Sequence, residues 1–315
     1  MDNTKDISIV VPLFNEDESL PHLAEWIDRV MEEHHFDYEV IMVDDGSKDT
    51  SWQVIEELHA KNPRYRGVKF RRNYGKSAAL NVGFAHAQGD VVITMDADLQ
   101  DSPDEVPDLY HMVKDEGYDL VSGWKKVRYD SKIAKNIPSK FFNWTTRKMS
   151  GINLHDFNCG LKAYRRDVVK SIEVYGEMHR YIPVIAKWAG FTRIGEKVVQ
   201  HRKRQYGVTK FGLNRFVNGY LDLMSIMFIS RFGKQPMHFF GLIGSLSFLL
   251  GFVSFVVVCV KKFCGLMALT NSVWFFVSLF FMMLGALLFL TGFISELICR
   301  NSATRNVYLI EKELD

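Results

Sequence analysis

The chain has 315 residues, which is long enough for one large domain with an appendage or for two ordinary domains. Its formal net charge of +2 and its lack of a long basic run argue against a nucleic-acid partner. The four cysteines have no metal-ligand spacing, and Cys259 and Cys299 lie in apolar segments, so we expect free thiols and no disulfide framework.

Apolar runs and amphipathic segments alternate along the chain as far as Ser122. The runs predict strands at residues 7–13, 38–43, 68–70, 91–95 and 119–122. The spacing of apolar residues predicts helices at about 18–35, after a cap at Asp49 or Thr50, at 77–87 and after Pro103. We expect Gly89 to end the helix at 77–87. Strands and helices that alternate in this way predict an α/β fold with a mostly parallel, doubly wound sheet.

The pattern becomes less regular after Gly123. Residues 137–152 and 214–232 combine aromatic and apolar side chains with a small number of charges. This pattern is compatible with amphipathic helices that lie in a membrane interface. A helix that faces a protein core has the same pattern, so both interpretations stay open.

Two segments near the C-terminus, 239–260 and 273–295, each run without a charge for about 20 residues, the length that spans a bilayer. The short loop between them predicts a membrane hairpin, with both of its ends on one side. Basic residues flank the hairpin at Arg231, Lys234, Arg300 and Arg305. The polar N-terminus has no signal peptide, so we expect both ends in the cytoplasm of a multi-pass inner (plasma) membrane protein. Lys261 and Lys262 in the loop oppose this orientation, and two buried helices of a soluble protein are the alternative to a hairpin.

Polar motifs follow four of the predicted strands, and the carboxyl ends of parallel strands meet at one edge of a sheet. The motifs are Asn15-Glu16, Asp44-Asp45-Gly46-Ser47, Asn73-Tyr74-Gly75-Lys76 and Asp96-Ala97-Asp98. In extended geometry Asp96 and Asp98 would point to the same side, where they would suit Mg²⁺ or Mn²⁺ shared with a phosphate-bearing ligand. A pair of solvated loop acids is the ordinary alternative. No Gly-x-Gly-x-x-Gly follows the first strand, and Gly75-Lys76-Ser77 lacks the upstream glycine of a Walker loop, which disfavours NAD-type and P-loop sites.

The order of these motifs resembles that of the family 2 inverting glycosyltransferases, which have a GT-A fold with a Rossmann-like nucleotide-sugar domain. The matching residues are Pro-x-x-Asn-Glu at 12–16, Asp-Asp-Gly-Ser at 44–47, Asn-x-Gly-Lys at 73–76 and Asp-Ala-Asp-Leu-Gln-Asp at 96–101. The segments 156–160 and 202–211, together with the two apolar spans, extend the resemblance over nearly the whole chain. They make it most similar to the membrane-anchored polyprenyl- or dolichol-phosphate mannosyl/glucosyltransferases. Thr209 stands where that family often has Ser, which keeps the hydroxyl group.

The resemblance also implies roles for single residues. The nucleoside site would be lined by Pro12, Phe14, Glu16, Val43 and Asp45. Within it Asp45 would contact the base, and Asp96 and Ala97 would lie beside the ribose or the diphosphate. Mg²⁺ or Mn²⁺ would be held by Asp96, Asp98 and Gln100. Phosphates would face Lys76, Arg202, Arg204 and Lys210. The residues expected to act in catalysis are Asp98, Asp156, Arg204 and Lys210.

Elementary chemistry supports part of this assignment. A nucleotide sugar loses a diphosphate, so a metal ion and cations must stabilise the developing negative charge. The basic residues near Arg204 suit that task, although a juxtamembrane basic patch that attracts anionic lipids has the same composition. A lipid phosphate is already a nucleophile near neutral pH, so Asp156 is either a base or a residue that orients the acceptor or stabilises charge. We interpret Cys159 as a packing residue and the histidines at 155, 179 and 201 as structural.

The sequence thus predicts four regions: a cytoplasmic GT-A domain at 1–212, a juxtamembrane amphipathic helix at 213–235, two spans within 236–299 and a tail at 300–315. The expected activity is transfer of a sugar from a UDP- or GDP-sugar to a polyprenyl (undecaprenyl) phosphate, with inversion, to give a lipid-linked sugar for cell-envelope polysaccharide. Assembly into homo-oligomers through the spans is compatible with this reading. One alternative is a polysaccharide synthase, which should have more spans and a Gln-x-x-Arg-Trp motif. The other is a catalytically silent membrane scaffold or flippase partner.

Overall fold

The structure is a computed structural model that describes residues 5–126, 146–148, 150–176, 178–202, 228, 232, 235–265 and 272–300. Contacts within the chain divide it into two compact units, Met1–Leu223 and Met224–Asp315. The amphipathic helices predicted at 137–152 and 213–235 lie largely outside the described residues.

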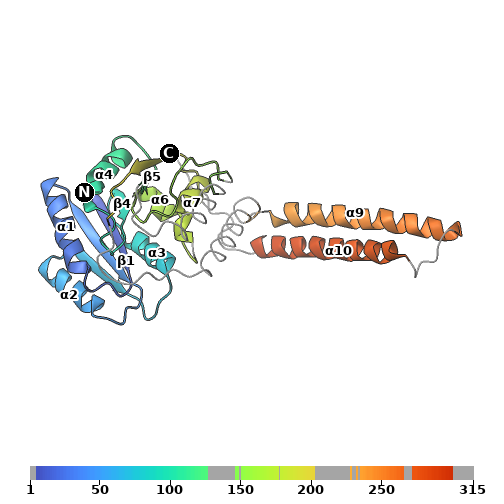
Figure 1. Cartoon of the computed structure of the whole chain (residues 1–315), viewed down its shortest axis with the longest axis horizontal. Helices are drawn as coiled ribbons and strands as arrows, with labels where there is room; N and C mark the ends of the chain where they lie inside the picture. The colour runs from blue at the N-terminus through green and yellow to red at the C-terminus, as the bar shows by residue number, and fades with distance from the viewer. Residues whose placement is uncertain are drawn as a thin grey trace, which may run out of the picture. The chain divides into compact units, whose positions relative to one another are not determined.

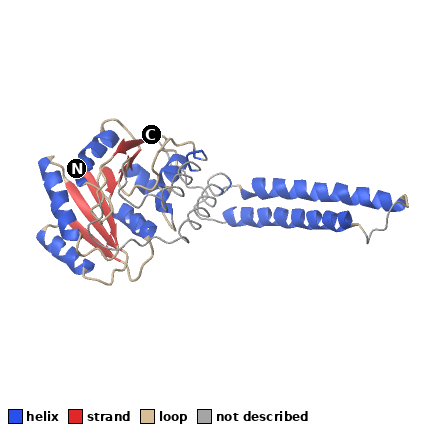
Figure 2. Cartoon of the chain, in the orientation of Figure 1, coloured by secondary structure: helices blue, strands red, loops and turns tan. Residues whose placement is uncertain are grey.

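Apolar and β-branched runs of the first unit form a seven-stranded sheet in the order β3-β2-β1-β4-β6-β5-β7 (Figure 2). The strands are β1 Ile7–Leu13, β2 Tyr38–Asp44, β3 Tyr65–Lys69, β4 Val91–Thr94, β5 Leu120–Trp124, β6 Lys162–Arg165 and β7 Ile194–Val198. Every strand pair is parallel except those that β6 makes with β4 and β5. The sheet is therefore mixed but mostly parallel, and the predicted fold class is confirmed. All five predicted strands are present, although β3 begins at Tyr65 and ends at Lys69 instead of spanning 68–70.

Two strands were not predicted, because neither has the pattern of a buried run. β6 is only four residues long and has a basic residue at each end, yet it lies between β4 and β5. β7 is an edge strand whose residues are half-buried or exposed, and it combines Gly195, Glu196 and Lys197. Each strand is held by partners that are distant in sequence, so a local pattern does not reveal it.

Helices cover both faces of the sheet (Figure 1). They are α1 Leu20–Glu33, α2 Ser51–Lys61, α3 Lys76–His86, α4 Val106–Lys114, α6 Arg166–Ser171 and α7 Ile182–Trp188, with short 3₁₀ turns at Pro103–Glu105 (η1) and Met178–Arg180 (η2). Buried side chains of α1 and α4 join the odd-numbered residues of β1, such as Ile9 and Val11, in one hydrophobic core. On the opposite face, Gly83 of α3 lies against Val10, so closely that a Cβ atom would overlap the valine. This two-sided arrangement is that of a doubly wound sheet.

The expectation that Gly89 ends the third helix is wrong. The helix ends at His86, and its C-cap residue Ala87 is already extended. Gly89 instead approaches the start of β1, where a Cβ atom would lie 2.5 Å from the backbone nitrogen of Ser8. Glycine is therefore needed for this close approach rather than for a left-handed helix end.

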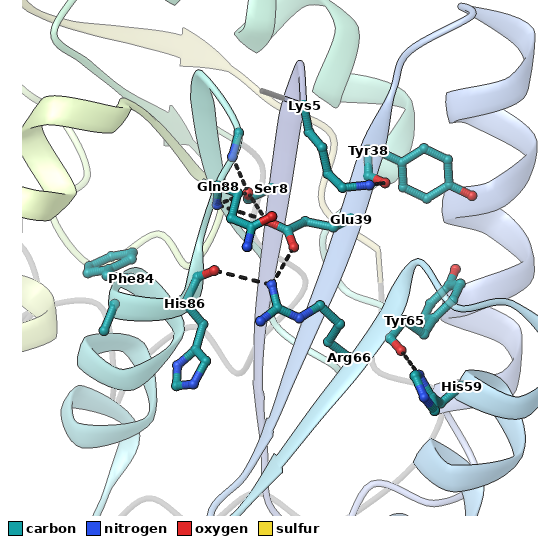
Figure 3. A network of polar contacts seen from close by, with 12 residues as sticks. Lys5, Ser8, Tyr38, Glu39, His59, Tyr65, Arg66, Phe84, His86 and Gln88 are labelled. Atoms are coloured by element: carbon teal, nitrogen blue, oxygen red, sulfur yellow. Dashed lines mark hydrogen bonds and ion pairs between the residues drawn. The ribbon is translucent and has the colours of Figure 1, made fainter. Parts of the chain in front are cut away.

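A buried carboxylate connects the strands at the amino-end edge of the sheet, opposite the predicted site (Figure 3). Glu39 is 1% exposed and accepts hydrogen bonds from Ser8 Oγ at 2.6 Å and from the Gln88 backbone N–H at 2.8 Å. Arg66 donates to its other oxygen at 2.7 Å. These contacts join β1, β2, β3 and the loop before β4, so they fix the alignment of the strands whose opposite ends carry the polar motifs.

The second unit contains two long helices, α9 Pro236–Phe263 and α10 Val273–Arg300, which lie side by side (Figure 1). Small residues allow close packing: a Cβ atom on Gly285 would lie 2.5 Å from the backbone nitrogen of Phe248, and one on Gly251 would lie 2.7 Å from that of Met282. Both helices are long and apolar enough to cross a membrane. Many of their large apolar side chains are exposed, which fits a lipid-facing hairpin better than the alternative of a soluble core.

Candidate active site

The end of β2 anchors the loop that follows β3. Asp45 is 5% exposed, and its carboxylate accepts backbone N–H groups from Tyr74 at 2.6 Å and from Gly75 at 2.9 Å. Burial raises the pKa of Asp45, and these two hydrogen bonds partly oppose that shift. Gly46 has a φ of 75°, and a Cβ atom there would lie 2.5 Å from the backbone of Arg72. Asp45 therefore holds in place the loop that leads into Lys76, and its contact with a base stays a prediction.

The residues after β4 form an acidic turn that comprises Asp96, Asp98 and Asp101. The extended geometry assumed for Asp96 and Asp98 is wrong, because the chain turns here and Leu99 has a φ of 59°. Asp98 accepts the backbone N–H of Gln100 at 3.2 Å. Burial raises the pKa of Asp98, and the nearby carboxylates of Asp96 and Asp101 raise it further. The turn therefore concentrates negative charge, although strand geometry does not set the directions of the Asp96 and Asp98 side chains.

Three lysines surround this acidic turn. Lys76 pairs with Asp96, and Lys125, just after β5, forms an ion pair with the fully buried Asp101 at 2.6 Å. Desolvation opposes ionisation of Asp96, but Lys76 and Lys125 outweigh it and lower the pKa. Lys162 on β6 is 3% exposed and donates to the carbonyl oxygen of Cys159. Burial lowers the pKa of Lys162. Acidic and basic groups from β4, α3, β5 and β6 thus meet at one place.

The loop before β6 brings Asp156 to the same region. The carboxylate of Asp156, which is 2% exposed, accepts the Asn158 backbone N–H at 3.0 Å. Gly160 lies directly against Asp96, and a Cβ atom there would overlap that carboxylate. Thr94 Oγ1 on β4 donates to the Gly160 carbonyl at 2.7 Å and so holds the loop beside the acidic turn. Cys159 is buried, and burial raises the pKa of its thiol to about 12, which agrees with a packing role.

Other predicted site residues are found in different situations. Pro12 and Val43 are register partners on β1 and β2, while Phe14 and Glu16 follow β1 and are partly buried. Ala97 is 3% exposed within the acidic turn.

The basic segment that begins at Arg202 starts beside the acidic turn, because the Arg202 backbone N–H donates to the Gln100 carbonyl at 3.0 Å. The Arg202 guanidinium, however, lies over the Trp26 ring at 4.1 Å and 4.0 Å from Asp104, so it packs on α1 and η1 rather than on the acidic turn. Arg204 and Lys210 lie outside the described residues.

The acidic turn is suitable for a divalent cation. Together with Gln100 it offers carboxylate and amide oxygens, the ligands that Mg²⁺ and Mn²⁺ prefer. The pKa of Asp98 is raised first by burial and then by the charges of Asp96 and Asp101, and a bound cation would offset both effects. Among the residues that the structure describes, no group of three or more His, Cys, Asp or Glu side chains is arranged to hold a metal ion. The residues therefore fit an ion that takes a small number of ligands from the protein and the rest from phosphate oxygens and water.

Three residues of this cluster have no role among the functions predicted from the sequence. Lys125 follows β5 directly, so the same strand-end rule that selected the other motifs would have found it. Asp101 belongs to the motif already recognised at 96–101 but had no assigned function. Lys162 could not be found in this way, because its strand was not predicted.

Residues 8–173 match the family model of glycosyl transferase family 2. The chain is 38% identical over 241 residues to the dodecaprenyl-phosphate galacturonate synthase of Rhizobium johnstonii, a match that covers 76% of this chain and 71% of the relative. It is 35% identical over 265 residues to the undecaprenyl-phosphate 4-deoxy-4-formamido-L-arabinose transferase of Aeromonas hydrophila, which covers 83% and 79% of the two chains.

Crystal structures with a similar fold include the glucosyl-3-phosphoglycerate synthase of Mycobacterium tuberculosis. Its complex with uridine diphosphate aligns with a TM-score of 0.54 and 20% identity, over 72% of this chain and 80% of that one. Its complex with Mn²⁺ and uridine-diphosphate-glucose aligns with a TM-score of 0.53 and 21% identity, over 73% and 79%. At this level of identity the likeness concerns the fold.

Proposed function

This chain belongs to glycosyl transferase family 2 and is a glycosyltransferase, and we propose that it transfers a sugar from a UDP- or GDP-sugar to a polyprenyl phosphate such as undecaprenyl phosphate. The predicted family and enzyme class are confirmed, and a catalytically silent scaffold is not supported. The names of the two relatives above describe sugar transfer to dodecaprenyl and undecaprenyl phosphate, which supports the acceptor class. A polysaccharide synthase is expected to have more membrane spans. The two apolar helices found among the described residues therefore favour a transferase that acts on a lipid acceptor.

The observation that carries the proposal is the meeting of the acidic turn with three lysines at the carboxyl edge of the sheet. Such a transferase must handle a diphosphate leaving group and a phosphate acceptor, both anionic. Lys76 and Lys125 supply positive charge close to Asp96 and Asp101, and the buried Lys162, whose pKa is lowered by burial, lies beside them. Carboxylates that bind a cation and lysines that attract phosphates are both needed for this chemistry.

The donor nucleotide is proposed to bind at the ends of β1, β2 and β4. Pro12, Phe14, Glu16, Val43 and Asp45 would line the nucleoside site, and Ala97 with Asp96 would lie beside the ribose and diphosphate. A Mg²⁺ or Mn²⁺ ion held by Asp98, with Asp96 and Gln100, would stabilise the negative charge of the departing diphosphate. Lys76, Arg204 and Lys210 would bind phosphate oxygens, whereas the guanidinium of Arg202 packs on Trp26 instead.

The reaction is proposed to be a single displacement. An oxygen of the lipid phosphate forms a bond to the anomeric carbon while the bond from that carbon to the diphosphate oxygen breaks, and the diphosphate leaves with the electron pair. The configuration at the anomeric carbon is therefore inverted. With a second pKa of about 6, the phosphate needs no strong base, so Asp156 would orient the acceptor or stabilise positive charge on the sugar.

The two apolar helices are proposed to anchor the enzyme as a hairpin in the inner (plasma) membrane, with the catalytic domain in the cytoplasm. In this organisation residues 1–212 form the transferase domain, 213–235 an interfacial helix, 236–299 the two spans and 300–315 a cytoplasmic tail. The length and apolar surface of α9 and α10 support the anchor.

The full chain, purified in detergent or lipid nanodiscs, tests this function directly. Undecaprenyl phosphate is mixed with a panel of radiolabelled UDP- and GDP-sugars that includes uronic acids and aminopentoses, with Mg²⁺, Mn²⁺ or EDTA. We expect one donor to give a lipid-linked product that is lost with EDTA. If no donor in the panel labels the lipid while the nucleotide products also fail to appear, the proposal is wrong.

A further inference from the structure

Side chains from two neighbouring strands hold the backbone of the loop that carries Asp156. Ser122 on β5 and Glu196 on β7 are direct register partners in the sheet. Ser122 Oγ donates to the carbonyl oxygen of Asp156 at 3.3 Å, and Glu196 Oε2 accepts the backbone N–H of His155 at 2.7 Å. Adjacent positions on the sheet thus fix two consecutive residues of the loop.

Three sets of contacts hold His155 and the residue before it. In addition to its bond with the backbone, Glu196 contacts the imidazole Nδ1 through its other carboxylate oxygen. The imidazole is also held by Trp124, at the end of β5. The indole of Trp124 stacks on the imidazole with a ring separation of 4.1 Å and an interplanar angle of 12°. The residue before it is also held, since Arg147 donates to the Leu154 carbonyl at 2.8 Å and 3.2 Å. His155 is therefore fixed both at its backbone and at its ring.

We propose that Glu196 is a positioning residue of the transferase, which acts through His155 to set the location of the Asp156 carboxylate. This inference rests on the proposed function, because it takes Asp156 as the carboxylate that meets the acceptor or the sugar. The contacts of Glu196 are with the backbone and the ring of His155. It holds the residue next to Asp156, while Ser122 holds Asp156 itself.

The physical need for such a device follows from where Asp156 lies. Its loop connects the segment around 150 with β6, and a loop without side-chain anchors is more mobile than a strand. A catalytic carboxylate has to be kept within about 0.5 Å of its productive position, and a displacement of about 1 Å can cost a factor of about 100 in rate. Two anchors on the rigid strands β5 and β7 supply that precision.

The proposal predicts that donor binding and turnover respond separately. The proposed donor residues belong to the ends of β1, β2 and β4, whereas Glu196 is on β7, at the far edge of the sheet. Removal of Glu196 should therefore lower kcat and leave the KM for the nucleotide sugar nearly unchanged. A merely structural residue would not separate these two constants.

The test compares Glu196→Ala and Glu196→Gln in the full-length enzyme with a control, Asp119→Ala. Asp119 is a more deeply buried carboxylate that, like Glu196, accepts a backbone N–H, that of Arg193 at 3.0 Å. It lies just before β5, at the amino ends of the strands and away from the proposed site. For each variant kcat, KM for the donor and the midpoint of thermal unfolding are measured. We expect Glu196→Ala to lose about 10- to 100-fold in kcat.

The conservative variant should rescue activity. The glutamine side chain can still accept the His155 backbone N–H with its oxygen and can place its amide group beside the imidazole, so Glu196→Gln should recover most of the rate. Asp119→Ala should lower the unfolding midpoint without a selective loss of kcat. Equal kcat in Glu196→Ala and the wild type, or the same loss of kcat in Asp119→Ala, would overturn the proposal.

Two further arms keep the outcome clear. If Glu196→Ala does not fold, Ser122→Ala removes only the contact with the Asp156 carbonyl, and it should show the same selective fall in kcat. An unchanged kcat in that variant contradicts the positioning device. If the wild-type enzyme labels no polyprenyl phosphate, the proposed function fails, whereas an active wild type with an equally active Glu196→Ala refutes only the role of Glu196.

Discussion

At the scale of single residues, Asp98 combines a partly buried carboxylate with two acidic neighbours. Burial and the charges of Asp96 and Asp101 raise its pKa, so in the absence of a cation its ionised form is held at an energetic cost. Groups with perturbed pKa values often occur at functional sites, and this one lies at the carboxyl end of a buried parallel strand. The same features that make Asp98 unfavourable for stability make it suitable as a ligand for a divalent ion.

The substitution Asp98→Asn should therefore separate activity from stability. We expect sugar transfer to fall by about 100-fold or more, because the charge that binds the cation is lost. The midpoint of thermal unfolding should stay the same or rise, since a repulsive charge is removed. Transfer is measured with the labelled donor and unfolding by circular dichroism. A variant that transfers sugar at the wild-type rate would exclude Asp98 as a metal ligand.

Gly160 offers a second test at this scale. A methyl group at this position would overlap the carboxylate of Asp96, which is the end of a flexible side chain and can move away. We expect Gly160→Ala to reduce transfer strongly with little change in thermal stability. Gly67→Ala serves as the control, because its Cβ atom would lie 2.6 Å from Ile55 in the packing between β3 and α2. That variant should lose stability and keep its rate, and a reversed pattern would contradict the assignment.

At the scale of elements, the amino-end network around Glu39 holds four segments in register. Glu39 is buried and bonded to Ser8, Gln88 and Arg66, so its removal leaves a buried donor and a cation without their acceptor. β1 and β2 pair without interruption along their whole length. The alignment fixed at their amino ends therefore determines the relative positions of Pro12 and Val43 near their carboxyl ends. A network remote from the site thus contributes to its geometry.

The variant Glu39→Ala should lower the free energy of unfolding by about 3 kcal/mol, because it breaks a buried charged network. Chemical denaturation followed by circular dichroism measures this change. Asp37→Ala is the matched control, since its ion pair with Lys5 spans 3.7 Å and its carboxylate is half exposed. The control should stay within about 0.5 kcal/mol of the wild type. Similar losses in both variants would show that Glu39 is not the anchor of the network.

At the scale of the whole molecule, the chain combines a sheet covered by helices on both faces with a pair of long apolar helices. Close approaches at Gly251 and Gly285 let the helix backbones pack together, which is how helices associate when water supplies no driving force. The exposed surface of the pair consists largely of leucine, phenylalanine and valine side chains. A polyprenyl phosphate is confined to the membrane, so an anchored transferase meets its acceptor in two dimensions.

The native cysteines test the proposed orientation. Cys264 is exposed just after α9, in the segment that joins the two helices, whereas Cys159 is buried in the first unit. If both ends of the hairpin are cytoplasmic, a membrane-impermeant maleimide should label Cys264 in intact spheroplasts. Cys264→Ser should abolish this labelling. Labelling of Cys264 that requires lysis of the spheroplasts would place the loop in the cytoplasm and reverse the orientation.

Part of this architecture can be predicted from the sequence because it depends on patterns of neighbouring residues. Runs such as Ile7–Leu13 and Tyr38–Asp44 are almost wholly apolar, as strands buried on both faces must be, and the apolar helices are evident from their length alone. The alternation assumed for Asp96 and Asp98 failed because the chain leaves extended geometry after Thr94. The prediction that Gly89 ends the helix failed because this glycine packs against Ser8 of β1, about 80 residues earlier in the chain.

The sequence by itself thus determined the α/β alternation, the apolar hairpin and the placing of four polar motifs at one edge of the sheet. It did so because periodicity is local and because parallel strands direct their carboxyl ends to the same side. Only the tertiary structure decided that β6 enters between β4 and β5 and places Gly160 and Lys162 beside Asp96, and that β7 brings Glu196 to the Asp156 loop. These short, partly charged strands gain their stability from partners distant in sequence, so their positions depend on the packing of the whole sheet.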